Sequence, residues 1–186
     1  RQLADVCRHA ASLLEALARS LASSSDRLAV RDVTGQVTAL AEAASPVSHA
    51  DPELTRVLLR LRFLALYHLI ELGDSAVQAI TVGEPLTADL DRLLGPEHPD
   101  TLNARNSLAA AYQAAGRPAD AIRLFEQTLV IRERLLGPEH PDTLTTQNNL
   151  ATAYKDAGRA GEARLMFELT LAAKERLLGS NHPSTL

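Results

Sequence analysis

Three histidines recur at a fixed step and are the first residues that could do chemistry. His98, His140 and His182 each precede a proline, and each lies 42 residues from the next. Imidazole nitrogens bind zinc, but every ligand of one ion must lie about 2 Å from it. If each step is a pair of helices, successive histidines lie about 20 Å apart, because each helix layer adds ~8–10 Å. We therefore expect these residues to begin helices, and we predict no metal site.

The sequence contains no motif that would support catalysis. There is no Gly-x-Ser-x-Gly, no His-Glu-x-x-His, no cysteine–histidine arrangement and no glycine-rich loop for a phosphate. Cys7 is the only cysteine, which excludes a disulfide within the chain and fits a reducing, cytoplasmic setting. Cys7 is expected to be a small buried residue on a helix. We expect no catalytic residue and no cofactor.

Asparagines form the other group of side chains that could bind a ligand. Asn103, Asn106, Asn148 and Asn149 lie in segments with a helical pattern, although asparagine is a poor residue for a helix interior. A carboxamide both donates and accepts hydrogen bonds, so it could bond the main chain of a bound peptide. The alternative is that these amides bond neighbouring helices or remain in contact with water.

The composition favours an all-helical fold and disfavours nucleic acid or membrane as a partner. The 186 residues are rich in alanine and leucine and contain no Trp. The net charge of −4 divides into 9 basic and 12 acidic residues before position 93, and 10 and 11 after it. Neither part has the basic excess of a phosphate-backbone binder. The longest apolar stretch, residues 57–72, contains Arg60 and Arg62 and is too short to cross a bilayer.

A ten-residue motif repeats and organises the second half of the chain. LLGPEHPDTL occupies residues 93–102 and, unchanged, residues 135–144, and LLGSNHPSTL occupies residues 177–186. Over the full step, residues 93–134 and 135–176 share 25 identities in 42 positions. Such self-similarity at a fixed period indicates a repeat array.

The pattern within each 42-residue step predicts two helices joined by a short turn. The first helix is expected at 99–115 and at 141–157, and in both cases a glycine in a left-handed C-cap ends it. The second helix is expected at 118–136 and at 160–178, and again ends at a glycine. No alternation typical of strands is present anywhere.

Apolar residues at helical spacing also predict four helices before the repeats, over residues 2–21, 27–44, 52–72 and 75–94. The second of these is expected to close at Ala44-Ser45-Pro46. In the fourth, Gly83 and Pro85 lie inside the helical pattern, so a kink or a break is expected there.

The residues inside each hairpin resemble the tetratricopeptide repeat. The shared positions are Leu108, Ala109, Tyr112, Gly116, Ala121 and Phe125, and the same residues stand 42 positions later. The usual period of that repeat is 34 residues, and the longer period here resembles the kinesin-light-chain type. Thr128 and Thr170 stand where the family usually has alanine, and we expect them to fit. The resemblance implies an all-α fold, a right-handed α-solenoid of antiparallel helical hairpins.

The repeat period and the resemblance together divide the chain into segments. The stretch before the first full repeat looks like an earlier, degenerate hairpin, because Gly73 and Gly95 are spaced like Gly116 and Gly137, to within one residue. The expected segments are an N-terminal helical pair at 1–48 that acts as a cap or linker, the degenerate hairpin at 49–95, repeats at 96–137 and 138–179, and the start of a further repeat at 180–186.

The resemblance also implies a binding function. In tetratricopeptide arrays the first helix of each hairpin lines a concave groove that holds peptides, so a protein or peptide ligand is expected. Asn149 stands where the family often uses asparagine to bind the main chain or a carboxylate of its ligand. The groove positions that the resemblance implies are Asn103, Asn106, Ser107, Ala110, Gln113, Thr145, Asn148, Asn149, Thr152 and Lys155.

Two other functions stay open at this point. Long repeats of this kind also occur at the C-terminal end of bacterial signalling ATPases of the STAND type. The resemblance would then imply a regulatory arm that packs on another domain of its own chain. A third hypothesis is a structural spacer that self-associates end to end, because the outer helices of a solenoid expose apolar faces.

Overall fold

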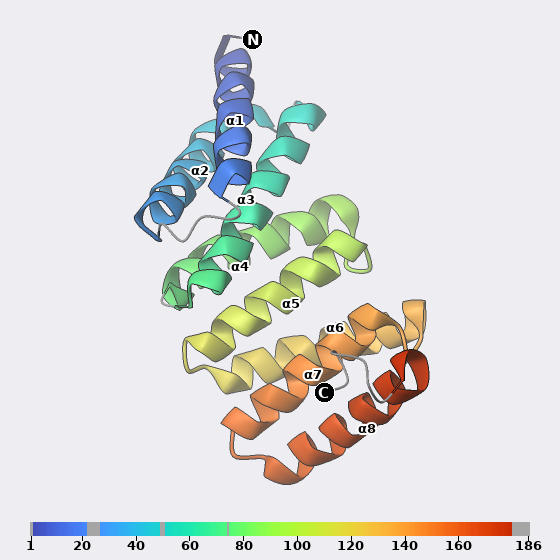
Figure 1. The fold of residues 1–186 in the computed structure, drawn as a ribbon. Coiled ribbons are helices and arrows are strands. Elements are labelled where there is room, and N and C mark those ends of the chain that lie inside the picture. Colours follow the sequence, from blue (N-terminus) through green and yellow to red (C-terminus); the bar gives the residue numbers. More distant parts are fainter. Residues whose placement is uncertain (1, 22–26, 49–50, 74, 180–186) are drawn as a thin grey trace. The chain divides into compact units, whose positions relative to one another are not determined.

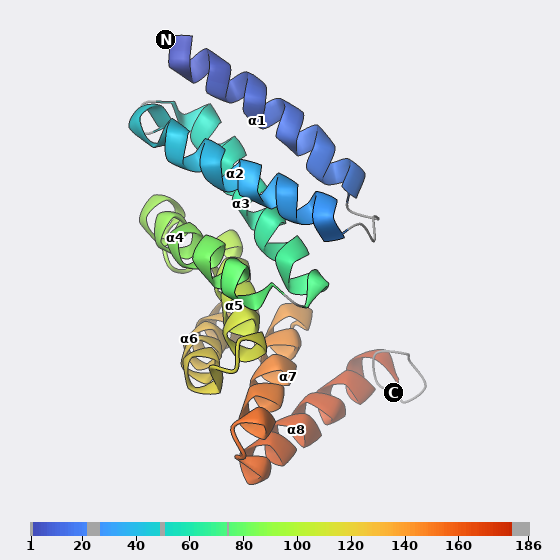
Figure 2. The same ribbon diagram turned by 90° about the vertical axis from the view of Figure 1, so that its left-hand side faces the viewer.

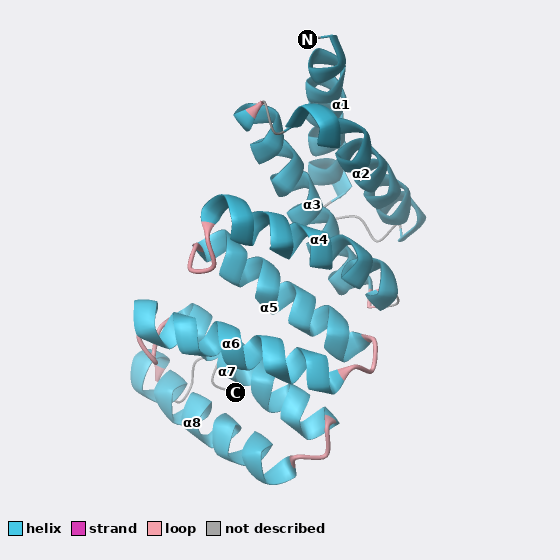
Figure 3. Ribbon diagram, turned by 180° about the vertical axis from the view of Figure 1, so that it is seen from behind, coloured by secondary structure: helices cyan, strands magenta, loops and turns pink. Residues whose placement is uncertain are grey.

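The chain is all-helical in a computed structural model that describes residues 2–21, 27–48, 51–73 and 75–179 (Figures 1 and 3). The helices of these residues are α1 (Gln2–Leu21), α2 (Arg27–Ser48), α3 (Pro52–Leu72), α4 (Ala76–Leu94), α5 (Pro99–Ala114), α6 (Pro118–Leu136), α7 (Pro141–Asp156) and α8 (Ala160–Leu178). They form two compact units, Arg1–Gly95 with α1–α4 and Pro96–Leu186 with α5–α8. Among the described residues, no helix is both long enough and apolar enough to cross a membrane.

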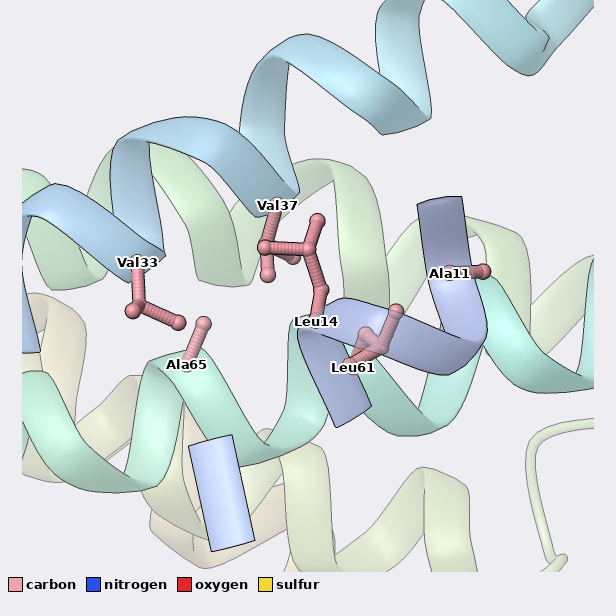
Figure 4. Packing of buried hydrophobic residues seen from close by; sticks show 6 residues of the cluster. All are labelled: Ala11, Leu14, Val33, Val37, Leu61 and Ala65. Carbon is pink, nitrogen blue, oxygen red and sulfur yellow. The ribbon is translucent and has the colours of Figure 1, made fainter. Parts of the chain in front are cut away.

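The first unit is built on three helices, α1, α2 and α3, that pack against one another, with α4 against α3 (Figure 2). Figure 4 shows the core between them, which consists of Ala11, Leu14, Val33, Val37, Leu61 and Ala65. A second cluster contains Cys7, which is 3% exposed, together with Ala44, Leu54 and Leu58. The prediction that Cys7 is a small buried residue is confirmed.

One predicted helix end in the first unit is wrong, and one of two alternatives at Pro85 is excluded. α2 continues through Pro46 to Ser48, because a proline in the last turn removes one intrahelical hydrogen bond but does not prevent helical dihedrals. α4 is one helix that continues through Pro85, so no break occurs there, and the alternative of a kink stays a prediction. The hydroxyl of Thr87, two residues after the proline, bonds the carbonyl oxygens of Gly83 at 3.0 Å and Glu84 at 2.9 Å.

The second unit consists of two helical hairpins, α5–α6 and α7–α8, joined by short turns (Figure 3). Their bounds match the predicted helices to within one residue. The turn inside the first hairpin contains Gly116 at φ 72°, the left-handed conformation predicted for it. α7 packs against α6 and touches α5, so the second hairpin rests on the first.

The connectors of the repeat begin their helices through the histidine side chains. Nδ1 of His98 accepts a 3.2 Å hydrogen bond from the backbone N–H of Asp100, and Nδ1 of His140 accepts a 3.1 Å bond from Asp142. Each histidine thus occupies the N-cap and satisfies a backbone donor that would otherwise lack a partner. The predicted role at the helix start is confirmed for these two, and His182 lies outside the described residues.

Small and polar residues inside the second unit allow the helices to approach closely. Ala109 and Ala121 are fully buried, and so is Phe125. Thr128 and Thr170 are also buried, and each hydroxyl donates a 2.8 Å hydrogen bond to the carbonyl oxygen four residues earlier in its own helix. They fit where the family usually has alanine, because no polar atom of theirs is left unpaired.

Candidate binding surfaces

A buried arginine joins the two hairpins of the second unit. Arg132 is only 3% exposed, and its guanidinium donates to Oγ1 of Thr146 at 2.7 Å, the carbonyl of Asp142 at 2.9 Å and Oδ1 of Asn103 at 2.5 Å. Burial lowers the pKa of Arg132, and the charge of Asp142 opposes that shift. Asn103, a predicted groove residue, therefore bonds a neighbouring helix of its own fold.

Two further polar pairs cross the same junction. Nε2 of Gln113 donates a 2.5 Å hydrogen bond to the carboxylate of Asp156. The hydroxyl of Tyr154 donates a 2.7 Å bond to Oε1 of Glu126. Gln113 is thus a second predicted groove residue that the structure uses between its own hairpins, at an exposed position.

The remaining groove residues on α5 and α7 differ in how far they are free to bind. Oδ1 of Asn106 is buried without a hydrogen-bond partner among the described residues. The hydroxyls of Thr145 and Thr152 donate to the backbone of their own helix, at 2.9 Å and 3.0 Å. Ser107 and Ala110 are half-buried on α5.

Asn149 and Asn148 are the predicted residues whose amides stay available. Both are half-buried on α7, and the structure gives neither side chain a hydrogen bond within the part of the chain that it describes. Asn103 and Gln113 on α5 are already engaged. The four asparagine positions therefore divide into Asn103, which holds the fold together, Asn106, whose Oδ1 is buried, and two that could hydrogen-bond a ligand.

A groove of about 600 Å³ lies between α7 and α8, and we call it the α7–α8 groove. Asn148 and Lys155 of α7 line it from one side. From α8, an apolar floor is made by Ala163, Phe167 and Leu171, and the charged residues Arg164, Glu168 and Lys174 surround it. Among the described residues, no group of three or more metal-ligating side chains is present.

Sequence reasoning found Asn148 and Lys155 but missed the α8 side of this groove. The signal was present in the 42-residue repeat, since Ile122 in α6 corresponds to Arg164 in α8. Ile122 is 6% exposed, whereas Arg164 is exposed. The change from a buried isoleucine to an arginine is thus the sequence feature that separates α8 from α6 at this position.

A smaller hollow in the first unit, about 360 Å³, contains a cluster of charges. Arg62 contacts Asp89 at 2.6 Å, and Arg92 contacts the same carboxylate at 3.2 Å. Burial raises the pKa of Asp89, but the hydrogen bonds from Arg62 and Arg92 outweigh it and the net pKa is lowered. The carboxylate already satisfies both cations, so this cluster is accounted for by packing of α3 and α4.

Known proteins share this architecture. The profile of a family described as tetratricopeptide repeat matches residues 68–132 and 104–176. The chain belongs to this family. Tetratricopeptide repeats are generally protein-interaction scaffolds without catalytic function, and no enzyme family is indicated.

This tetratricopeptide repeat chain is similar to a kinesin-light-chain-related protein. The Arabidopsis thaliana protein KINESIN LIGHT CHAIN-RELATED 3 is 38% identical over 59 residues, which is 32% of this chain and 9% of that protein. The matched segment is thus a small part of that relative. The predicted kinesin-light-chain-like type of repeat is confirmed.

Solved structures confirm the all-α repeat fold. The putative kinesin light chain of Podosopora anserina, with nearly identical TPR-like repeats, has a TM-score of 0.70 at 24% identity and covers 98% of this chain and 81% of that one. BtubC (BKLC) from P. vanneervenii has a TM-score of 0.61 at 19% identity and covers 100% of this chain and 77% of that one. At these identities the likeness is evidence for the fold alone.

Proposed function

We propose that this tetratricopeptide repeat chain binds a protein or peptide segment along α5 and α7, through the amide of Asn149 and its neighbours. The observation that carries the proposal is that, among the described residues, the Asn149 amide on α7 has no hydrogen bond, whereas Asn103 and Gln113 on α5 are committed to internal bonds. Asparagine costs a helix interior roughly 0.5 kcal/mol relative to alanine. A residue that disfavours its own helix and has no hydrogen bond to the described residues is best explained by a ligand.

The chemistry of this face suits an extended main chain. The amide of Asn149 can donate one hydrogen bond to a peptide carbonyl and accept another from a peptide N–H. Ser107 occupies the corresponding position on α5, and its hydroxyl can do the same. Ala110 and Thr152 provide small neighbours that let a backbone approach. The face therefore favours ligands recognised mainly through their main chain, with side chains adding specificity.

The test is a peptide-library selection on the immobilised chain, followed by anisotropy titration of the enriched peptides. Asn149→Ala should weaken those peptides by about tenfold, which corresponds to a net 1.4 kcal/mol for the lost hydrogen bonds. Gln127→Ala is the matched control, because it removes a carboxamide from an exposed position of α6. Equal affinity of the wild type and Asn149→Ala for every enriched peptide would refute the assignment.

The ligand of this face can also belong to the same polypeptide. A regulatory arm on a STAND-type ATPase would use the same main-chain recognition toward a neighbouring domain. In that arrangement Asn149→Ala would release the arm and change the activity of the neighbouring domain, whereas a free partner would be lost without that change. Both forms of the proposal share the Asn149 contact and are separated by this readout.

A further inference from the structure

Arg132 carries a charge that the second unit buries without a carboxylate beside it. Its guanidinium donates only to oxygens that bear no full charge, namely the hydroxyl of Thr146, the backbone carbonyl of Asp142 and the amide oxygen of Asn103. Within the described residues it forms no ion pair. A charge removed from water is costly, and bonds to neutral groups offset that cost only in part. The stability of the fold alone therefore does not account for an arginine here.

The repeat itself shows an apolar alternative. One step of 42 residues earlier, Leu90 stands at the position of Arg132 and Ala104 at the position of Thr146. Leu90 is 3% exposed and Ala104 is fully buried, so both positions accept buried apolar side chains. Replacing a buried charged group by well-packed apolar residues is often neutral or stabilising. What the polar pair adds is therefore direction rather than stability.

Two of the three bonds from Arg132 fix the beginning of α7. They reach the carbonyl of Asp142 at 2.9 Å and Oγ1 of Thr146 at 2.7 Å, and Thr146 in turn donates to the same carbonyl at 3.0 Å. Bonds from a planar guanidinium constrain direction as well as distance, whereas apolar packing is non-directional. Buried polar groups at helix interfaces are best attested as devices that fix the register. The triangle of Arg132, Asp142 and Thr146 therefore resists rotation or sliding of α7 along α6.

Asn149 shares the part of α7 that these bonds hold. It lies three residues after Thr146, and residues three apart are neighbours on a helix surface. Because backbone hydrogen bonds keep a helix rigid over one turn, a shift of Thr146 moves the amide of Asn149 with it. Groups that bind a ligand must stay within about 0.5 Å of their productive position. The bonds that hold Thr146 therefore decide where the Asn149 amide lies.

We propose that Arg132 is the positioning residue of the face that carries Asn149. Through Asp142 and Thr146 it sets the register of α7 on α6 and, with it, the place of the Asn149 amide, and it does not itself touch the ligand. The effect on binding rests on the proposed function, whereas the effect on α7 exists without any ligand. The two effects can therefore be tested apart.

The first test replaces the polar pair by the residues that the chain uses one repeat earlier. Arg132→Leu/Thr146→Ala should unfold at an equal or higher urea concentration than the wild type. Peptides selected on the wild-type chain should nevertheless bind this variant about tenfold more weakly in anisotropy titrations. A purely structural role would give the opposite pattern, with lower stability and an unchanged affinity of the folded variant, and that pattern would overturn the proposal.

Two substitutions of Thr146 repeat the test with smaller changes. Thr146→Val keeps the shape of the side chain but removes the acceptor for Arg132, and should weaken the same peptides about threefold or more. Thr146→Ser keeps the hydroxyl and should bind as the wild type does. Asn103→Ala is the matched control, because it removes only the bond from Arg132 to α5 and should leave the affinity unchanged. Equal binding by Thr146→Val and Thr146→Ser would contradict the positioning role.

An NMR measurement separates this inference from the proposed function. Residual dipolar couplings of the backbone amides report the orientation of α7 relative to α6 in the full chain, with no peptide present. Thr146→Val and Arg132→Leu/Thr146→Ala should change the couplings of α7, and Asn149→Ala should not. Unchanged α7 couplings in both of the first two variants would refute the positioning role, whatever the peptides do. Changed couplings, combined with no peptide bound by the wild type, would uphold it and refute only the proposed function.

Discussion

Tyr154 of α7 donates a 2.7 Å hydrogen bond to the carboxylate of Glu126 on α6, and so ties the second hairpin to the first. The guanidinium of Arg159 lies over the face of the same tyrosine ring, 4.3 Å from its centre. Burial, followed by the bond to Glu126, raises the pKa of Tyr154 to about 12. The pair is a measurable link between the repeats.

Tyr154→Phe should destabilise the second unit while the fold is retained. The ring still fills its place, but Glu126 loses its donor, and a hydrogen bond to a charged acceptor contributes roughly 1–2 kcal/mol net. Urea unfolding followed by circular dichroism should show the loss. Glu126→Gln keeps an acceptor and should cost less than Tyr154→Phe. Unchanged stability in Tyr154→Phe would mean that the bond contributes nothing.

The raised pKa of Tyr154 also predicts a pH dependence at the alkaline end. Below about pH 10 the phenol is protonated in both the folded and the unfolded chain, so its full contribution is present. Between pH 10 and the folded pKa of about 12, only the unfolded chain releases the proton, so the stability it provides falls as pH rises. The stability difference between wild type and Tyr154→Phe should therefore shrink from pH 9 to pH 12. A constant difference would show that Tyr154 titrates normally.

Asn103→Ala tests whether this asparagine is part of the fold or of a ligand site. It would leave one donor of the buried Arg132 guanidinium without its 2.5 Å partner, at a cost of about 1–3 kcal/mol. Peptides that depend on Asn149 should bind Asn103→Ala with unchanged affinity at a temperature where the variant stays folded. Normal stability combined with lost peptide binding would instead make Asn103 a groove residue.

The sequence was sufficient for the helices and their caps, because these depend on local chemistry. Each of these signals affects the backbone only within a few residues. They are the spacing of the apolar residues, the prolines after His98 and His140, and the glycines at the turns. The polar junction was not predictable in this way. Asn103 and Arg132 are 29 residues apart, and no local rule says that one turns toward the other.

The differences from prediction in the first unit have the same origin. Pro46 and Pro85 are helix breakers by local rules, yet the helical backbone continues through both. Ala44, beside the first, is fully buried in the core. The α7–α8 groove was missed because the exposure of Phe167 and Leu171 depends on what covers them. From their residue types alone, both side chains would be predicted to lie in the hydrophobic core.

His140→Ala tests the N-cap role against a metal role. Removing Nδ1 leaves the backbone N–H of Asp142 without its 3.1 Å acceptor and should cost about 1 kcal/mol. His140→Asn provides another capping acceptor and should recover most of that loss. Added zinc should not change the melting temperature of the wild type. A zinc-dependent rise that His140→Asn removes would instead indicate a metal ligand.

Gly137→Ala should be among the most destabilising single-methyl additions in the chain. Gly137 ends α6 at φ 90° and ψ 161°, a conformation that is essentially restricted to glycine and costs other residues of order 1–3 kcal/mol. No atom lies within 4 Å of where its Cβ would be, so the cost is backbone strain and not a clash.

Gly161 is the matched control, since it lies inside α8 without a positive φ and also has open space. Gly161→Ala should therefore stabilise the chain by about 0.5–1 kcal/mol. Equal effects of the two substitutions on the free energy of unfolding would show that the connector tolerates an L-residue at Gly137.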